Sequence, residues 1–216
     1  IAGEDEAKLV LNEVLDKYSG LKLDIYTCPD RKTTVKTRIM AGNQHLLRVD
    51  NEDKHDINVT QEKEIMDRFS KLLSTDTING VILQDYNKGL LTPQVIESII
   101  NFCVSKGIPT FVDPKEKNFF AYKKCTFFKP NKKEVMQSVG LQMELADIDK
   151  YLRERLTHEV SLITLGKEGL YIHDGTKGTI YPASPRMISD VCGAGDSVIS
   201  VVSLCYLKGM DLSSIG

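Results

Sequence analysis

Short apolar runs alternate with amphipathic segments along most of this chain. The amphipathic segments repeat apolar residues every three or four positions, which predicts helices over residues 6–18, 60–73, 92–107, 132–139 and 144–156. The short apolar runs predict strands over residues 33–40, 44–50, 78–83, 110–112, 126–128 and 160–165, and a hairpin over 170–181. Strands separated by amphipathic helices are typical of an α/β fold in which helices cover both faces of a mostly parallel sheet.

The two strands predicted at 33–40 and 44–50 break this alternation. Gly42 and Asn43 form a turn signal between them, so the pair is interpreted as a hairpin ribbon. Because no helix accompanies the ribbon, we expect it to stand off the main sheet as a small lid at about residues 33–50, within a single domain that spans residues 1–216. An isolated hairpin is only marginally stable, so the apolar side of this ribbon needs a partner.

A glycine-rich run precedes an apolar stretch at 198–207 that has the character of a buried helix. Gly193, Ala194 and Gly195 would place their backbone amides at the start of that helix, where free N–H groups and the helix dipole favour an anion. Asp196 adds a carboxylate beside this cradle, and the combination suits phosphoryl transfer to a hydroxyl group. The alternative is an ordinary glycine-rich turn with an acid at a helix start.

Polar clusters follow the predicted strands, at residues 84–89, 113–115, 129–134 and 166–169. The carboxyl ends of parallel strands meet at one edge of a sheet, where ligands bind in folds of this class. The clusters therefore favour a site at that edge. The alternative is that Asp113 and Glu134 are acids at helix starts and that Lys132 and Lys133 are solvated.

Composition argues against several classes of function. The 28 Lys and Arg residues nearly balance the 30 Asp and Glu residues, which gives no electrostatic case for nucleic acid or an anionic membrane as a partner. The five cysteines form no Cys-x-x-Cys pair, so we expect reduced thiols without a disulfide framework or a zinc site. No apolar run reaches the roughly 18 residues of a membrane span, and the first residues are acidic, so the predicted location is the cytoplasm.

Residues 190–196 read Asp-Val-Cys-Gly-Ala-Gly-Asp and resemble the second signature of the ribokinase-like (PfkB-type) carbohydrate kinases, approximately Asp-Thr-x-Gly-Ala-Gly-Asp. The chain departs from the family pattern at Cys192, where a hydroxyl residue is usual, and at Val201, where a small residue is usual. The resemblance implies a ribokinase-like three-layer sandwich. It also implies that Asp196 is the catalytic base and that the amides of residues 193–195 form the anion hole.

Two further motifs are similar to the same family. Asn131 and Glu134 match an Asn-x-x-Glu motif whose glutamate organises Mg²⁺ and the phosphates, largely through water. Thr164, Gly166 and Gly169 match a Thr-x-Gly-x-x-Gly segment that lines the nucleotide. The resemblance therefore implies ATP and Mg²⁺ as cofactors, with Glu134 at the metal, and leaves a monovalent cation open.

Within the family, residues 36–50, 85–89 and 112–115 most resemble kinases that phosphorylate the anomeric hydroxyl of D-glycero-D-manno-heptose 7-phosphate with ATP. The product, heptose 1,7-bisphosphate, is a precursor for the lipopolysaccharide core. The resemblance implies substrate contacts from Lys36, Arg38, Arg48, Asp85, Lys88, Asp113 and Lys115. The basic residues of this set are candidates to hold the distal sugar phosphate, and the sequence does not decide between them. The resemblance also suggests a homodimer formed through the ribbon, with contacts from Ile39, Leu47 and Val49.

The resemblance leaves two alternatives open. One is another kinase of the family, acting on ribose, fructose 1-phosphate or a nucleoside. The other is a non-catalytic α/β domain that binds a nucleotide or sugar, although binding alone needs no carboxylate such as Asp196 at the anion cradle. The family's first strand and sugar-binding motif have no match ahead of Ile1, and its last helices have none after Gly216. We therefore expect a fragment that lacks both ends of the domain.

Overall fold

The computed structural model describes residues 1–42, 44–140, 142–184 and 193–216. These residues form two compact units. The first unit comprises residues 1–61 and 88–90, and the second comprises residues 62–87 and 91–216. Each unit has secondary structure of its own.

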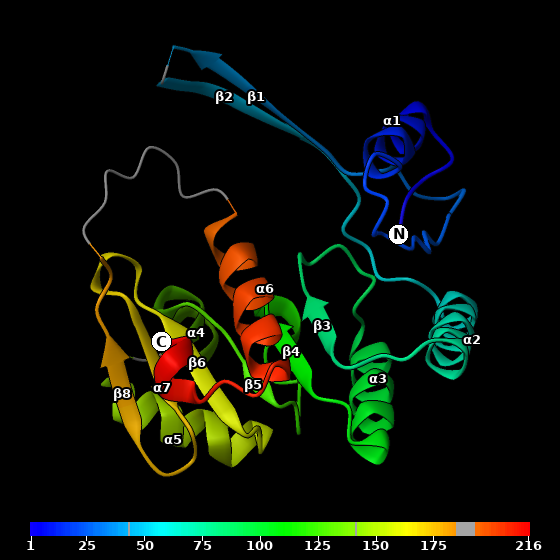
Figure 1. The fold of residues 1–216 in the computed structure, drawn as a ribbon. Coiled ribbons are helices and arrows are strands. Elements are labelled where there is room, and N and C mark those ends of the chain that lie inside the picture. Colours follow the sequence, from blue (N-terminus) through cyan, green and yellow to red (C-terminus); the bar gives the residue numbers. More distant parts are fainter. Residues whose placement is uncertain (43, 141, 185–192) are drawn as a thin grey trace. The chain divides into compact units, whose positions relative to one another are not determined.

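The first unit contains helix α1 and a two-stranded ribbon (Figure 1). Helix α1 (Glu6–Leu15) begins after Asp5, whose carboxylate accepts the N–H of Lys8 and so caps the helix. The helix ends at Leu15, three residues before the predicted end at 18. The ribbon strands β1 (Val35–Ala41) and β2 (Gln44–Asn51) confirm the predicted hairpin.

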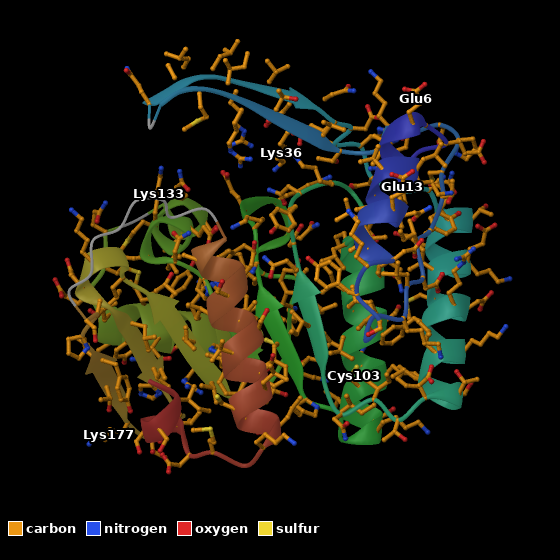
Figure 2. The ribbon with its side chains drawn as sticks, turned by 45° about the horizontal axis from the view of Figure 1, so that its top comes forward. Glu6, Glu13, Lys36, Cys103, Lys133 and Lys177 are labelled. Atoms are coloured by element: carbon orange, nitrogen blue, oxygen red, sulfur yellow. The ribbon has the colours of Figure 1, made fainter. Side chains whose placement is uncertain are left out.

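The antiparallel register of the ribbon separates basic from apolar side chains. Arg38 lies opposite Arg48, and Ile39 lies opposite Leu47. Because successive residues of a strand point to opposite faces, the basic pair lies on one face and the apolar pair on the other. Lys36, two positions before Arg38 and labelled on the ribbon in Figure 2, shares the basic face.

The second unit is built on a six-stranded sheet in the order β3-β4-β5-β6-β7-β8. Its strands are β3 (Val81–Gln84), β4 (Thr110–Asp113), β5 (Phe127–Phe128), β6 (Val160–Thr164), β7 (Leu170–His173) and β8 (Gly178–Tyr181). The first four strands are parallel, and the last two are antiparallel to their neighbours and form a hairpin. This mostly parallel sheet confirms the predicted α/β class, although β3 begins at Val81 and not at residue 78.

Helices alternate with these strands as the sequence pattern predicts. They are α2 (Val59–Thr75), α3 (Pro93–Lys106), α4 (Lys132–Val139), α5 (Leu145–Leu156), α6 (Ala194–Leu207) and α7 (Leu212–Ile215), with 3₁₀ turns at Glu116–Asn118 and Gly166–Glu168. Thr92 caps α3 and Pro93 occupies its first turn, as predicted. Within the described ranges, no helix is both long and apolar enough to cross a membrane.

The sheet buries aromatic side chains on both of its faces. On one face, Phe111 of β4 and Phe127 of β5 pack edge-to-face against Tyr206 of α6, with ring centroids 5.7 and 4.9 Å apart. On the other face, Phe128 packs against Phe119 at 5.1 Å. Figure 1 shows α6 in front of the strands and α4 and α5 behind them. The second unit therefore has the predicted layers of helix, sheet and helix.

Candidate active site

The described part of the glycine-rich run forms the start of α6. Gly193 is the N-cap residue and has a φ of +79°, a left-handed conformation that favours glycine. The N–H of Ser197 donates to the carbonyl of Gly193 at 2.9 Å, within the first turn of the helix. The amides of Ala194 and Gly195 precede this bond and have no acceptor within the helix, so they can bind an anion. Residues 190–192 of the motif lie outside the described residues.

Asp196 lies in the first turn of α6 and is half-buried. Its Oδ2 atom accepts a hydrogen bond from the hydroxyl of Tyr86, at 2.9 Å. Tyr86 follows strand β3, so this contact joins the start of α6 to the loop at the carboxyl end of the strand. Tyr86 could not be found from the sequence, because the two partners are 110 positions apart.

Three neighbouring strand ends carry a chain of polar groups beside this turn, and two of the three are buried. The side-chain amide of Gln84 donates to Oδ2 of Asp113 at 2.8 Å, and Nζ of Lys129 lies 3.1 Å from the same oxygen. The side chains of Asp113 and Lys129 are only 5% and 4% exposed. A Cβ atom added to Gly195 would lie 3.4 Å from Nζ of Lys129, which places the ion pair against the first turn of α6.

Lys129 is a candidate that the sequence pattern did not single out. A buried ammonium group is costly unless it is paired, and Asp113 supplies the pairing here. Beside Gly195, the ammonium adds positive charge where the helix dipole already favours an anion. The available signal was a lysine directly after two buried strand residues, Phe127 and Phe128.

Asp85, predicted to contact the substrate, is buried and bound on both oxygens within the protein. Oδ1 accepts the N–H of Asn87 at 2.7 Å, and Oδ2 accepts the hydroxyl of Tyr122 at 2.8 Å. Burial and the nearby Asp85 carboxylate raise the pKa of Tyr122 above its ordinary value, so the phenol stays protonated and donates. These contacts fix the loop that carries Tyr86, and the substrate contact of Asp85 stays a prediction.

Asn131 and Glu134 form a capping box at the start of α4. The Asn131 side chain accepts the N–H of Glu134 at 2.7 Å, and Oε2 of Glu134 accepts the N–H of Asn131 at 2.8 Å. The other carboxylate oxygen, Oε1, pairs with Nζ of Lys115. Burial lowers the pKa of Lys115, but the Glu134 carboxylate outweighs burial and leaves that pKa above its ordinary value. The Lys115 ammonium is therefore charged at neutral pH.

The segment predicted to line the nucleotide follows strand β6. Thr164 pairs with Asn131 in an isolated parallel bridge, so the two motifs meet at adjacent strand ends. Gly166 and Gly169 have φ values of +65° and +102°. A Cβ atom at Gly169 would lie 2.0 Å from the carbonyl oxygen of Tyr181, so only glycine fits there.

The acidic groups at this edge of the sheet bear on the predicted Mg²⁺ site. Among the described residues, no cluster of three or more His, Cys, Asp or Glu side chains is arranged to hold a metal ion. Both oxygens of Glu134 already have partners. Mg²⁺ at a nucleotide usually binds one or two carboxylates, phosphates and several waters. The residues therefore fit an ion that the nucleotide carries better than one held by protein ligands, and a role for Glu134 at that ion stays a prediction.

The remaining predicted substrate residues belong to the first unit. Lys88 forms an ion pair with Glu52 at 2.5 Å, and Arg48 donates two hydrogen bonds of 2.8 Å to Asp50. The buried Arg31, which the sequence analysis did not single out, donates to the carbonyl of Lys88 at 2.5 Å and to that of His55 at 2.6 Å. The structure thus groups Lys36, Arg38, Arg48 and Lys88 in one unit, and Asp85, Asp113 and Lys115 in the other.

The family model described as pfkB family carbohydrate kinase matches residues 3–216. The chain belongs to the pfkB carbohydrate kinase family. This pfkB-family chain is 35% identical over 217 residues to Bifunctional protein HldE of Aliarcobacter butzleri, covering 99% of the chain and 44% of the relative. It is 36% identical over 217 residues to Bifunctional protein HldE of Campylobacter jejuni, covering 98% of the chain and 44% of the relative. The chain thus spans less than half the length of these relatives.

Solved structures share the fold of this pfkB-family chain at low sequence identity. Phosphofructokinase-2 from Escherichia coli in complex with potassium has a TM-score of 0.80 and 14% identity, covering 99% of this chain and 70% of that chain. Ribokinase from Arabidopsis thaliana complexed with ribose and ATP has a TM-score of 0.70 and 14% identity, with the same coverage. These matches confirm the predicted ribokinase-like fold.

Proposed function

We propose that the protein containing this chain is an ATP-dependent carbohydrate kinase with Asp196 as its general base. The observation that carries the proposal is the start of α6, where a carboxylate and free amide groups lie together beside the strand ends of the sheet. An anion site next to a base is what transfer of a phosphoryl group to a hydroxyl requires. Membership of the pfkB family supports the same reaction.

In the proposed reaction the sugar hydroxyl attacks the γ-phosphorus of ATP and ADP leaves. Asp196 accepts the proton of that hydroxyl, and the amides of residues 193–195 hold the charge on the transferring phosphoryl group. Lys129 adds positive charge beside Gly195, and Asp113 holds the ammonium in place. Asp196 and Lys129 each have a partner within the protein, Tyr86 and Asp113, and such preorganisation favours electrostatic stabilisation.

ATP would lie along the strand ends that carry Asn131, Thr164, Gly166 and Gly169, because these residues match the nucleotide-lining motifs and two of them are paired. Mg²⁺ would be carried on the phosphates and would neutralise their charge, with Glu134 acting through water. Phosphofructokinase-2 shares this fold and has been solved in complex with potassium. We therefore propose that a monovalent cation is tested together with Mg²⁺.

The proposed acceptor is the anomeric hydroxyl of D-glycero-D-manno-heptose 7-phosphate. Support comes from the three segments that resemble heptose 7-phosphate kinases and from 35% identity to HldE along almost the whole chain. The basic face of the ribbon, with Lys36, Arg38 and Arg48, offers charge for the distal phosphate. Lys88 and Lys115 are the other candidates for this contact, and which basic residue makes it is left to experiment.

We also propose that the protein is a homodimer in which two ribbons cover each other. Ile39, Leu47 and Val49 lie on one ribbon face and are 46%, 55% and 50% exposed. Apolar side chains on a two-stranded ribbon gain little from their own unit, so a second copy of the ribbon is a suitable cover.

The test is a substrate panel with the full-length protein, ATP and Mg²⁺. The panel contains heptose 7-phosphate, the same heptose without phosphate, ribose, fructose 1-phosphate and a nucleoside. We expect ADP release and 1-phosphorylation with heptose 7-phosphate, and at least about a tenfold lower kcat/KM without the distal phosphate. Turnover of another sugar alone would replace the proposed substrate, and ATP binding without turnover of any sugar would favour the non-catalytic alternative.

A further inference from the structure

We infer that Tyr86 is a positioning residue that orients the catalytic base. This inference rests on the proposed function of Asp196. The phenolic hydroxyl of Tyr86 donates to Oδ2 of Asp196 at 2.9 Å. Catalytic bases are commonly held by a third group that fixes their orientation, and here a tyrosine occupies that place.

The two oxygens of the Asp196 carboxylate then have separate tasks. Oδ2 is held by Tyr86, and Oδ1 accepts no hydrogen bond from any described residue. A carboxylate on a helix can rotate about its side-chain bonds, and a hydrogen bond to one oxygen restricts that rotation. Oδ1 is thus presented to the acceptor hydroxyl, which needs a base within hydrogen-bond reach.

Tyr86 can perform this task because its own loop is fixed. Its neighbour Asp85 is buried and hydrogen-bonded to the N–H of Asn87 and the hydroxyl of Tyr122. Asn87 adopts a left-handed φ of +53°, which turns the chain immediately after Tyr86. The Tyr86 side chain is itself 46% exposed, so it is not part of the buried core.

The arrangement separates binding from chemistry. The hydroxyl of Tyr86 faces the base, so its removal should leave the binding of ATP and sugar nearly unchanged. What it should change is the fraction of time that Oδ1 points at the acceptor. The expected signature is a fall in kcat with little change in either KM.

The experiment uses Tyr86→Phe in the full-length protein, which deletes one oxygen and keeps the ring. We expect kcat to fall about 10-fold, with the KM for ATP and for sugar within about 3-fold of wild type. Tyr151→Phe is the matched control. Tyr151 lies on α5, where its ring contacts Phe120 and Arg155, and these ring contacts survive the substitution. The control should keep the wild-type kcat.

A double-mutant cycle with Asp196→Asn separates positioning from a general structural effect. If Tyr86 acts through the base, Tyr86→Phe should cost little more once Asp196 is replaced. Additive losses in the double variant, or an unchanged kcat in Tyr86→Phe, would overturn the inference. An inactive wild type would instead count against the proposed function, so the two failures are distinguishable.

Discussion

At the scale of single residues, the Asp196 carboxylate and the amides of Ala194 and Gly195 share the first turn of α6, and the Lys129 ammonium lies beside that turn. Asp196 and Gly195 can each be changed without removing a large apolar side chain from the core and without breaking the buried pair of Lys129 and Asp113. Their substitutions therefore test chemistry with limited risk to folding.

Asp196→Asn removes the charge of the proposed base and keeps its shape and its contact with Tyr86. We expect turnover to fall about 10²–10⁴-fold, the range for loss of a general base, while ATP binding changes less than about 2-fold. Steady-state kinetics and nucleotide titration of the full-length protein measure both quantities. Near-normal turnover in this variant would remove Asp196 from the mechanism.

Gly195→Ala tests the anion hole. The new methyl group would lie 3.4 Å from Lys129 and 3.5 Å from Asp113, which are ordinary contact distances, so the fold should persist with a nearly unchanged Tm. The methyl would nevertheless occupy space beside the amides, and we expect kcat/KM for ATP to fall by roughly 10-fold or more. Gly20→Ala is the control, because nothing lies within 4 Å of its added Cβ. Full activity in Gly195→Ala would mean that the phosphoryl group lies elsewhere.

Sequence reasoning located Asp196, Asp113 and Glu134 because each follows a local pattern, a glycine-rich run or the end of an apolar strand. It did not give their partners. Lys129 contacts Asp113 only because β4 and β5 are neighbours in the sheet. The local pattern of apolar residues does not predict the order of strands in a sheet. The substrate contact predicted for Asp85 stays a prediction, and the sequence did not give its hydrogen bonds with Asn87 and, 37 positions away, Tyr122.

At the scale of elements, a cluster of polar side chains connects α5 with β6 and β7 through hydrogen bonds. Arg153 donates to Asp149 at 2.9 Å and to the carbonyl of His173 at 2.7 Å. The ring of His158 lies 2.6 Å from the hydroxyl of Ser161 and is buried. The alternation of apolar residues predicted these three elements, but it could not predict the hydrogen bonds that connect them.

His158 gives this cluster a pH dependence. Burial, followed by the positive charge of Arg153, lowers the pKa of His158 to about 4, and Asp149 and His173 also face the cluster. The unfolded chain binds the proton near the ordinary pKa of about 6.5. The stabilisation is therefore complete above about pH 6.5 and declines toward pH 4, by up to roughly 3 kcal/mol.

Urea unfolding of the wild type and of His158→Gln between pH 7 and pH 4 measures this effect. We expect the wild type to lose more stability than the variant across that interval, since the variant has no proton to gain at this position. Equal losses in the two proteins would show that His158 is not buried in its neutral form.

At the scale of the whole molecule, the proposed dimer would make assembly and substrate binding depend on the same ribbon. Leu47→Asp places a charge in the apolar ribbon face, and we expect it to convert dimers to monomers at micromolar concentration. The KM for sugar phosphate should then rise more than the KM for ATP, because the basic face of the ribbon would lose its fixed position. Thr37→Asp, on the same ribbon face opposite Val49, should weaken the dimer for the same reason. Sedimentation of the wild type as a monomer would exclude the proposed dimer.

The two hydrogen bonds from Arg31 to the carbonyls of His55 and Lys88 join parts of the first unit that are far apart in the sequence. Residues 88–90 reach the first unit from within the second, so the ribbon unit is completed by a segment that the ribosome adds about thirty residues later. A recombination event that transplanted residues 1–61 alone would bury a guanidinium group deprived of one acceptor. We therefore expect the ribbon unit to lose stability when it is transplanted without residues 88–90.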